Sequence, residues 1–186
     1  MQALLGTIEL EARAPCDDVA PVIREALAAA SASPGYPTTA GTPAVRASAV
    51  AALQRRYGIT GLAEHAVLPV IGTKELIAWL PTLLGLGSDD LVVVPELAYP
   101  TYEVGALLAG APVVAADSLT QLGPQSPALV FINSPSNPTG RVLGVEHLRK
   151  VVTWARERDV VVASDECYAE LDWRDRSDPS IADWRR

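Results

Sequence analysis

The segment Asn133-Ser134-Pro135-Ser136-Asn137-Pro138-Thr139-Gly140 follows an apolar run at residues 128–132, and Asp165-Glu166-Cys167-Tyr168 follows a second run at residues 160–163. Such short runs of Val, Leu, Ile and Phe predict two buried strands. Residues 145–158 between them have a helical pattern, so the strands should be parallel. Open α/β sheets bind ligands at the carboxyl ends of their strands. An amide, an acid and a phenol gathered there suit a charged heteroaromatic cofactor.

The same alternation of apolar runs and helical segments extends toward the N-terminus. It predicts further strands at residues 66–71, 91–94 and 112–115, and further helices at residues 19–31, 43–57, 73–84 and 99–108. Asp18 is the expected N-cap of the first helix. Thr42 and Pro43 are expected to open the second, and Gly58 to close it. The fold class is therefore α/β: a three-layer αβα sandwich around a mostly parallel sheet.

Composition narrows the class of protein. The 186 residues are 49% hydrophobic and 20% charged, as in ordinary globular domains, and the net charge of -7 gives nucleic acid and anionic membranes no reason to bind. No apolar run approaches ~20 residues and no export signal is evident, so we expect no membrane contact and a cytoplasmic protein. Cys16 and Cys167 are expected to be free thiols, and His65 and His147 lack neighbours that would complete a metal site.

Two positions could hold a charged ligand. Gly72-Thr73 stands where a strand passes into a helix, and the first helical N–H groups there attract anions, although such a pair is often only a turn. Asp165 ends a buried strand, where a carboxylate needs a cation or several donors; a helix cap or a structural ion pair would also satisfy it.

Three further side chains could complete such a site. Tyr168 lies three residues after Asp165, Asn137 precedes a proline whose peptide bond can be cis, and Tyr99 follows the strand at residues 91–94. A ring at position 99 could stack on a flat ligand or simply fill the edge of the sheet.

Taken in order and spacing, these segments resemble the large domain of the class I/II pyridoxal-phosphate-dependent aminotransferases. The resemblance covers residues 19–173. It rests on Gly35-Tyr36-Pro37, Ile71-Gly72-Thr73-Lys74-Glu75, Pro95-Glu96-Leu97-Ala98-Tyr99-Pro100-Thr101-Tyr102, the Asn133–Gly140 segment and Ser164-Asp165-Glu166-Cys167-Tyr168. In the amino-acid sequence of residues 68–76 and 165–171, the chain is similar to the succinyldiaminopimelate aminotransferases of actinobacteria.

The resemblance implies a role for each candidate residue. Asp165 would pair with the pyridine nitrogen of pyridoxal 5'-phosphate, so that the ring can accept electrons. Tyr168 and Asn137 would bind the phenolic oxygen of the cofactor. The remaining members of the implied cofactor site are Gly72, Thr73 and Lys74 at the phosphate, Tyr99 against the ring, and Tyr36 at the phosphate of the neighbouring subunit in a homodimer. Among these, the Lys74 side chain is expected at the surface.

The chain also departs from the family pattern. The family's catalytic residue is a lysine that forms a Schiff base with the cofactor and lies well downstream of the Asp-x-x-Tyr element. The only lysines here are Lys74 and Lys150, so no catalytic lysine is identified. Two arginines of the family and its small domain are also not found. Residues 1–18 and 174–186 look like an arm and a tail outside the pattern, and we expect a chain truncated at both ends.

The implied activity is amino transfer, from glutamate to an acceptor of the N-succinyl-amino-oxopimelate type in lysine and diaminopimelate synthesis. Without the lysine, we expect this chain to be inactive alone, and the alternative is a non-catalytic remnant or interaction fragment. A magnesium-dependent nucleotide hydrolase would need a phosphate loop that the sequence does not contain. The expected incomplete sheet should expose strand edges and an apolar face, which favours poor solubility or a covering partner.

Overall fold

The computed structural model describes residues 18–124 and 126–174. The chain divides into two compact units, with the boundary between Thr39 and Ala40. The expected arm at residues 1–18 and tail at residues 174–186 lie outside the described residues, apart from Asp18 and Arg174. Cys16 lies outside them as well.

The first unit contains helix α2, Pro21–Ala30. The helix begins at Pro21 because proline suits the first helical position, where its missing N–H needs no partner. Its N-cap is therefore Ala20, which makes no side-chain cap hydrogen bond, and the expectation that Asp18 caps this helix is wrong. The large apolar side chains of this helix are exposed: Val22, Ile23 and Leu27 each expose half or more of their surface.

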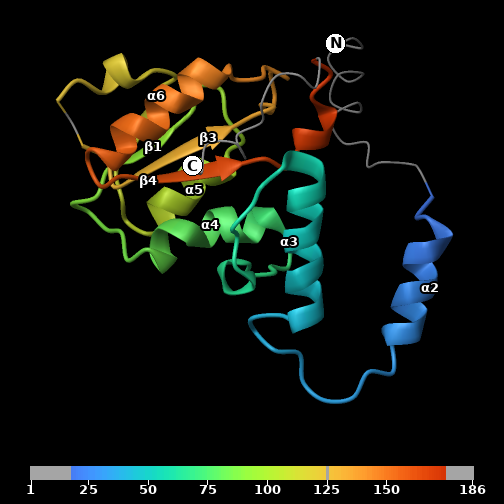
Figure 1. Ribbon diagram of the computed structural model, residues 1–186. Coiled ribbons are helices and arrows are strands. Elements are labelled where there is room, and N and C mark those ends of the chain that lie inside the picture. The colour runs from blue at the N-terminus through green and yellow to red at the C-terminus, as the bar shows by residue number, and fades with distance from the viewer. Residues whose placement is uncertain (1–17, 125, 175–186) are drawn as a thin grey trace, which may run out of the picture. The chain divides into compact units, whose positions relative to one another are not determined.

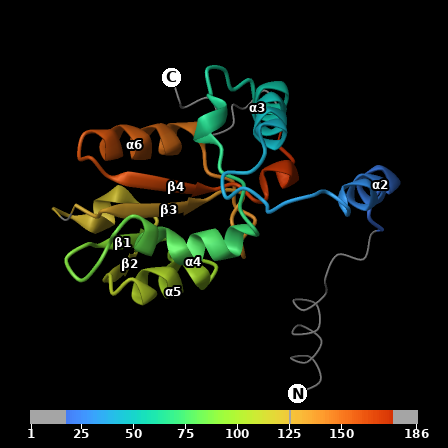
Figure 2. The ribbon, with the colours of Figure 1, turned by 90° about the horizontal axis from the view of Figure 1, so that it is seen from below.

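The second unit is built around four parallel strands. They are β1 (Val92–Val94), β2 (Val113–Ala115), β3 (Leu129–Asn133) and β4 (Val161–Asp165), in the order β2-β1-β3-β4 (Figures 1 and 2). The register pairs Asn133 of β3 with Asp165 of β4. The two polar segments that begin at Asn133 and Asp165 therefore leave the sheet side by side, at the carboxyl ends of neighbouring strands.

Helices cover both faces of this sheet. In Figure 2, α6 (Val145–Arg156) lies above it, and α4 (Thr73–Leu83) and α5 (Thr101–Leu108) lie below it. Two hydrophobic clusters fill the spaces between the layers, because alternate residues of each strand face opposite sides. Val92 and Phe131 pack toward α4 and α5, whereas Val93 and Val130 pack toward α6. The expected α/β fold with three layers is confirmed.

Gly105 allows α4 and α5 to pack closely. A Cβ at this position would lie 2.9 Å from the backbone oxygens of Ile77 and Ala78 on α4. That distance is shorter than van der Waals contact, so a larger residue would push the two helices apart.

Helix α3, Pro43–Tyr57, has the ends that the sequence predicts. The Thr42 hydroxyl accepts a hydrogen bond from the N–H of Val45 at 3.3 Å, and Gly58 takes the left-handed conformation with φ of 67°. Three short 3₁₀ turns complete the described chain: η1 (Glu64–Ala66), η2 (Leu119–Leu122) and η3 (Ala169–Leu171). None of the helices in the described residues is both long and apolar enough to span a bilayer.

The strand expected at residues 66–71 is not formed. Its first residue ends η1, and residues 67–70 form no regular element. The backbone at Val67 is extended, with φ of -106° and ψ of 122°, but no strand among the described residues pairs with the segment. Pro69 within it lacks the N–H that a central strand needs. At Val67 the backbone is thus extended as the apolar pattern predicts, while a strand also requires a neighbour.

Candidate functional site

A cavity of about 210 Å³ opens at the carboxyl ends of β3 and β4, on the side of the sheet that α4 and α5 cover. Ten side chains from four segments of the chain line it: Thr73, Lys74, Ile77, Tyr99, Tyr102, Asn133, Asn137, Asp165, Cys167 and Tyr168. Six of the eight residues that the sequence assigned to a cofactor are among them. Gly72 precedes the lining residue Thr73 in sequence and does not line the cavity itself.

Asp165 provides the carboxylate of this cavity. Its Oδ2 accepts a hydrogen bond from the Tyr102 hydroxyl at 2.7 Å, and its Oδ1 accepts one from the backbone N–H of Cys167 at 3.1 Å. Asp165 itself is half-buried at the end of β4. The carboxylate is therefore held in one orientation by two donors while it lines the cavity.

Two neighbouring acids remain protonated beside this carboxylate. Burial raises the pKa of Tyr102 far above its ordinary value, and the hydrogen bond to Asp165 raises it further. Partial burial of the thiol, followed by its hydrogen bond to Asp165, raises the pKa of Cys167 to about 11. At neutral pH the Tyr102 hydroxyl and the Cys167 thiol are therefore neutral, and both can donate a hydrogen bond to Asp165.

Asn133 connects β3, β4 and the loop that follows β3. Its Nδ2 donates to the carbonyl oxygen of Asp165 at 3.0 Å, and its Oδ1 accepts from the N–H of Asn137 at 2.8 Å. The loop contains two cis peptide bonds, Ser134-Pro135 and Asn137-Pro138. In the same loop, the Asn137 side-chain amide lies 3.4 Å from the Tyr168 hydroxyl. This is a long hydrogen bond between two of the expected ligand-binding groups.

The first turn of α4 closes another side of the cavity. Gly72 has a φ of 92°, which glycine adopts readily, and the helix starts at Thr73. The first N–H groups of a helix lack intrahelical partners, so this end attracts anions. The Lys74 ammonium lies 5.8 Å from the centre of the Tyr99 ring and adds a positive charge. Lys74 is exposed, as expected, and it also lines the cavity.

Tyr36 and Lys150, which the sequence analysis also considered, do not line this cavity. Tyr36 belongs to the first unit and is fully exposed there. Lys150 is an exposed residue of α6, the helix on the opposite face of the sheet. Within the described residues, no group of three His, Cys, Asp or Glu side chains could hold a metal ion.

For Tyr102 and Asn133, no role in the site is predicted from the sequence. Tyr102 lies three residues after Tyr99, the spacing that places two side chains on one face of a helix. That spacing could have identified it as a second aromatic residue of the site. For Asn133 no comparable signal exists, because its function depends on the register between β3 and β4.

Comparison with known proteins agrees with this geometry. Residues 6–182 match the model of the family described as "Aminotransferase class I and II". The chain is 74% identical over 168 residues to "Probable aminotransferase Rv1178" of Mycobacterium tuberculosis, covering 90% of this chain and 40% of that protein.

Two further relatives carry more specific names. The chain is 52% identical to the "4-dedimethylamino-4-oxo-anhydrotetracycline transaminase OxyQ" of Streptomyces rimosus, covering 96% of this chain and 49% of that protein. It is 35% identical to an "LL-diaminopimelate aminotransferase" of Gloeobacter violaceus, covering 87% and 45%. The chain thus spans less than half the length of each of these relatives.

Solved structures show the same fold. The crystal structure of an aminotransferase from Mycobacterium tuberculosis superposes with a TM-score of 0.80 at 29% identity, covering 91% of this chain and 49% of that one. The family is dependent on pyridoxal phosphate. Over nearly all of its length, this chain belongs to the class I and II aminotransferases.

Proposed function

We propose that this chain forms the cofactor-binding part of a pyridoxal-phosphate-dependent aminotransferase. The observation that carries the proposal is the single cavity in which the Asp165 carboxylate, the Tyr99 ring and the first turn of α4 come together. These groups suit three parts of the cofactor: a ring nitrogen that carries a proton, a flat aromatic ring and a phosphate.

The side chains fit the cofactor in the following way. The Thr73 hydroxyl, the Lys74 ammonium and the N–H groups beginning α4 would hold the phosphate. Asp165, oriented by Tyr102, would accept a hydrogen bond from the ring nitrogen and keep it protonated. When bound, pyridoxal phosphate supplies an electron sink for the loss of a proton from an amino acid.

The remaining groups would orient the cofactor. Asn137 and Tyr168 would hydrogen-bond its phenolic oxygen, and the raised pKa of Cys167 keeps that thiol from adding a second negative charge. Tyr36 would contact the phosphate bound to a second subunit, in a homodimer. This last role rests on the sequence motif alone.

The position of the two lysines bears on catalysis. Lys74 lines the cavity from α4, and Lys150 lies on the other face of the sheet. Neither follows Asp165 in sequence, where the family pattern has its lysine. We therefore propose that this chain binds the cofactor but does not complete a turnover by itself. The second candidate function, a non-catalytic or interaction fragment, rests on the same observation.

The donor that we propose is glutamate. The acceptor that we propose is a keto compound of the N-succinyl-amino-oxopimelate type, in lysine and diaminopimelate synthesis. The diaminopimelate name of a relative at 35% identity supports this choice. The name of a relative at 52% identity favours a second candidate, a ketone on a larger ring system. We propose that the protein works in the cytoplasm.

Absorbance titration with pyridoxal phosphate tests the cofactor site. We expect saturable binding that Asp165→Asn weakens about tenfold or more, because the charge-assisted hydrogen bond to the ring nitrogen is lost. Asp117→Asn is the matched control, since Asp117 also follows a strand of the sheet but lines a different cavity. Equal weakening by both variants, or no saturable binding, would overturn the proposed site.

Borohydride trapping followed by peptide mapping tests the role of the lysines. Lys74, Lys150 and the chain's N-terminal amine are the candidate amines. Diffuse labelling is the expected result for a cofactor site without its catalytic lysine. Stoichiometric and saturable labelling of Lys74 or Lys150 would show instead that this chain forms the covalent adduct itself, and it would overturn the proposal that the chain is incomplete for turnover.

A further inference from the structure

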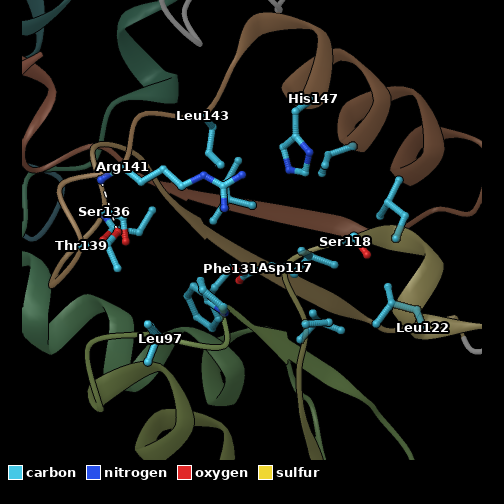
Figure 3. Close-up of a pocket in the computed structure, with 18 residues that line it drawn as sticks. Leu97, Asp117, Ser118, Leu122, Phe131, Ser136, Thr139, Arg141, Leu143 and His147 are labelled. Atoms are coloured by element: carbon cyan, nitrogen blue, oxygen red, sulfur yellow. Dashed lines mark hydrogen bonds between the residues drawn. The ribbon is translucent and has the colours of Figure 1, made fainter.

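A second cavity, of about 200 Å³, lies on the opposite face of the sheet, between the strands and α6 (Figure 3). Its wall is mostly aliphatic. The aliphatic residues that line it include Val93, Leu119, Leu122, Val130, Ile132, Leu143 and Val151. Among the described residues, Asn133 is the one that lines both this cavity and the cavity near α4. An aliphatic wall of this size suits a small hydrocarbon group.

One strong cation projects over this aliphatic wall. Arg141 leaves the loop after β3, and Figure 3 shows its side chain extending across the cavity toward His147 of α6. Within the described residues, its guanidinium has no salt bridge, whereas four other arginines do: Arg56, Arg149, Arg158 and Arg174. Arg141 is exposed, so water hydrates the guanidinium when no ligand is bound.

Three other polar side chains around the cavity already make hydrogen bonds within the chain. The Asp117 Oδ1 accepts from the N–H of Glu96 at 3.0 Å, and the Thr139 hydroxyl accepts from the N–H of Arg141 at 3.2 Å. The Ser118 hydroxyl bonds to Gln121. The guanidinium of Arg141 is therefore the polar group best placed to bind a ligand.

Local electrostatics favour an anion at this position. Burial lowers the pKa of His147, and the positive charge of Arg141 lowers it further, so the imidazole is neutral at pH 7.5 and can donate or accept a hydrogen bond. His147 also lies in the first turn of α6, where the helix dipole is positive. Asp117 also lines the cavity and contributes an opposing negative charge.

We propose that this cavity binds a small aliphatic carboxylate, with the carboxylate on Arg141 and the hydrocarbon group against Val130 and Leu143. A carboxylate matches the planar guanidinium with two parallel hydrogen bonds. Phosphate and sulfate are more strongly hydrated and gain nothing from the aliphatic wall. A 2-amino acid and a 2-oxo acid share the aliphatic carboxylate, and Asp117 beside the mouth would favour the amino acid.

Histidine NMR of the untagged chain provides a local test, because the sequence contains only His65 and His147. The probe is 4-methylpentanoate, titrated at pH 7.5. We expect a saturable shift of the His147 resonance while that of His65, in η1 and outside the cavity, stays unchanged. For a ligand of about eight non-hydrogen atoms, we expect a Kd of about 1 mM.

Matched ligands and variants identify the contact. Arg141→Gln should weaken binding about tenfold or more, and so should replacing the acid by the neutral 4-methylpentanamide. Arg156→Gln is the control, since it removes the same charge from an exposed position on α6 away from the cavity. Unchanged circular dichroism of Arg141→Gln shows that the fold is retained.

Other results would overturn the proposal. These are equal affinity for the acid and the amide, equal affinity of Arg141→Gln and the unaltered chain, and equal shifts of both histidine resonances. Each would mean that Arg141 only covers the aliphatic wall with its methylene groups. Leucine and 4-methyl-2-oxopentanoate distinguish the two ligand sources: binding of leucine that is tighter and is lost in Asp117→Asn identifies the amino acid, and the reverse order identifies the oxo acid.

Discussion

Tyr102 connects the hydrophobic core to the proposed cofactor site. Its ring is 1% exposed and packs against Phe131, with the ring centres 5.0 Å apart, and its hydroxyl donates to Asp165 at 2.7 Å. Tyr102→Phe keeps the ring and removes this one hydrogen bond. We expect the free energy of unfolding to fall by about 1–2 kcal/mol, measured by urea denaturation, because the acceptor is a carboxylate.

Tyr99→Phe is the matched control for this substitution. It removes a hydroxyl from the tyrosine three residues before Tyr102, and no hydrogen bond of the Tyr99 hydroxyl occurs within the described residues. The free energy of unfolding should change by only a few tenths of a kcal/mol. Equal losses in both variants would show that the Tyr102–Asp165 contact does not stabilise the fold.

His147 predicts a dependence of stability on pH. Its pKa is lowered in the folded chain, first by burial and then by Arg141, so the unfolded chain binds a proton at higher pH than the folded one. The contribution of neutral His147 is therefore complete above its ordinary pKa of about 6.5 and is lost as pH falls through that value toward the folded pKa. Urea denaturation at pH 7.5 and pH 5.5 should show a smaller decrease in stability for His147→Gln than for the unaltered chain. An identical decrease would contradict the lowered pKa.

The ligand-facing residues could be predicted to different degrees. Asp165, Asn137 and Tyr168 follow apolar strands, and parallel strands bring their carboxyl ends together, so the sequence pattern alone predicted their meeting. The hydrogen bonds of Asn133 depend on the pairing of β3 with β4, which no local pattern determines. Arg141 follows the recognised loop by one residue, and only the position of α6 shows that it lies over a cavity.

At the scale of elements, the N-cap of α3 provides a direct test. No residue of α3 is fully buried, so the helix depends on its ends and on the contacts of Arg56 and Tyr57 with Glu170 of η3. Thr42→Ala removes the side-chain acceptor for the N–H of Val45. We expect a loss of about 1 kcal/mol in the local stability of the helix, seen as roughly fivefold faster amide exchange across its first turns.

Thr42→Ser retains a hydroxyl at the cap and serves as the control. Its amide exchange should be no faster than that of the unaltered chain, because serine caps helices at least as well as threonine. If the serine and alanine variants exchange equally fast, the hydroxyl of Thr42 does not stabilise α3.

The elements also differ in how well sequence predicts them. The ends of α3 were predicted correctly because a threonine cap, a proline at the first position and a left-handed glycine act within a few residues. Residues 66–71 were assigned wrongly to a strand because strand formation requires a partner, which can lie anywhere in the chain. Asp18 was predicted wrongly as the N-cap because Pro21 begins α2 three residues later, which makes Ala20 the N-cap.

At the scale of the whole molecule, the sheet brings together two cavities on opposite faces. The loop after β3 contributes Asn137 to the cavity near α4 and Arg141 to the cavity near α6. The alternation of apolar runs with helical segments along the chain predicted the three layers. It could not predict the second cavity, because that depends on how closely α6 and η2 pack on the sheet.

The edge of the sheet at β4 predicts association between chains. In the described residues, β4 pairs only with β3, and Val161 on it is 44% exposed. An exposed apolar edge strand is a template for pairing with another chain, and a lysine on it opposes that pairing. We expect sedimentation velocity over a concentration series to show self-association of the unaltered chain, and Val161→Lys to shift it toward the monomer.

Thr153→Lys adds the same charge on an exposed turn of α6, away from the edge, and should leave the association unchanged. Equal effects of the two lysines would assign the change to net charge instead of to the edge of β4, and an unaltered chain that stays monomeric throughout the series would show that this edge is protected.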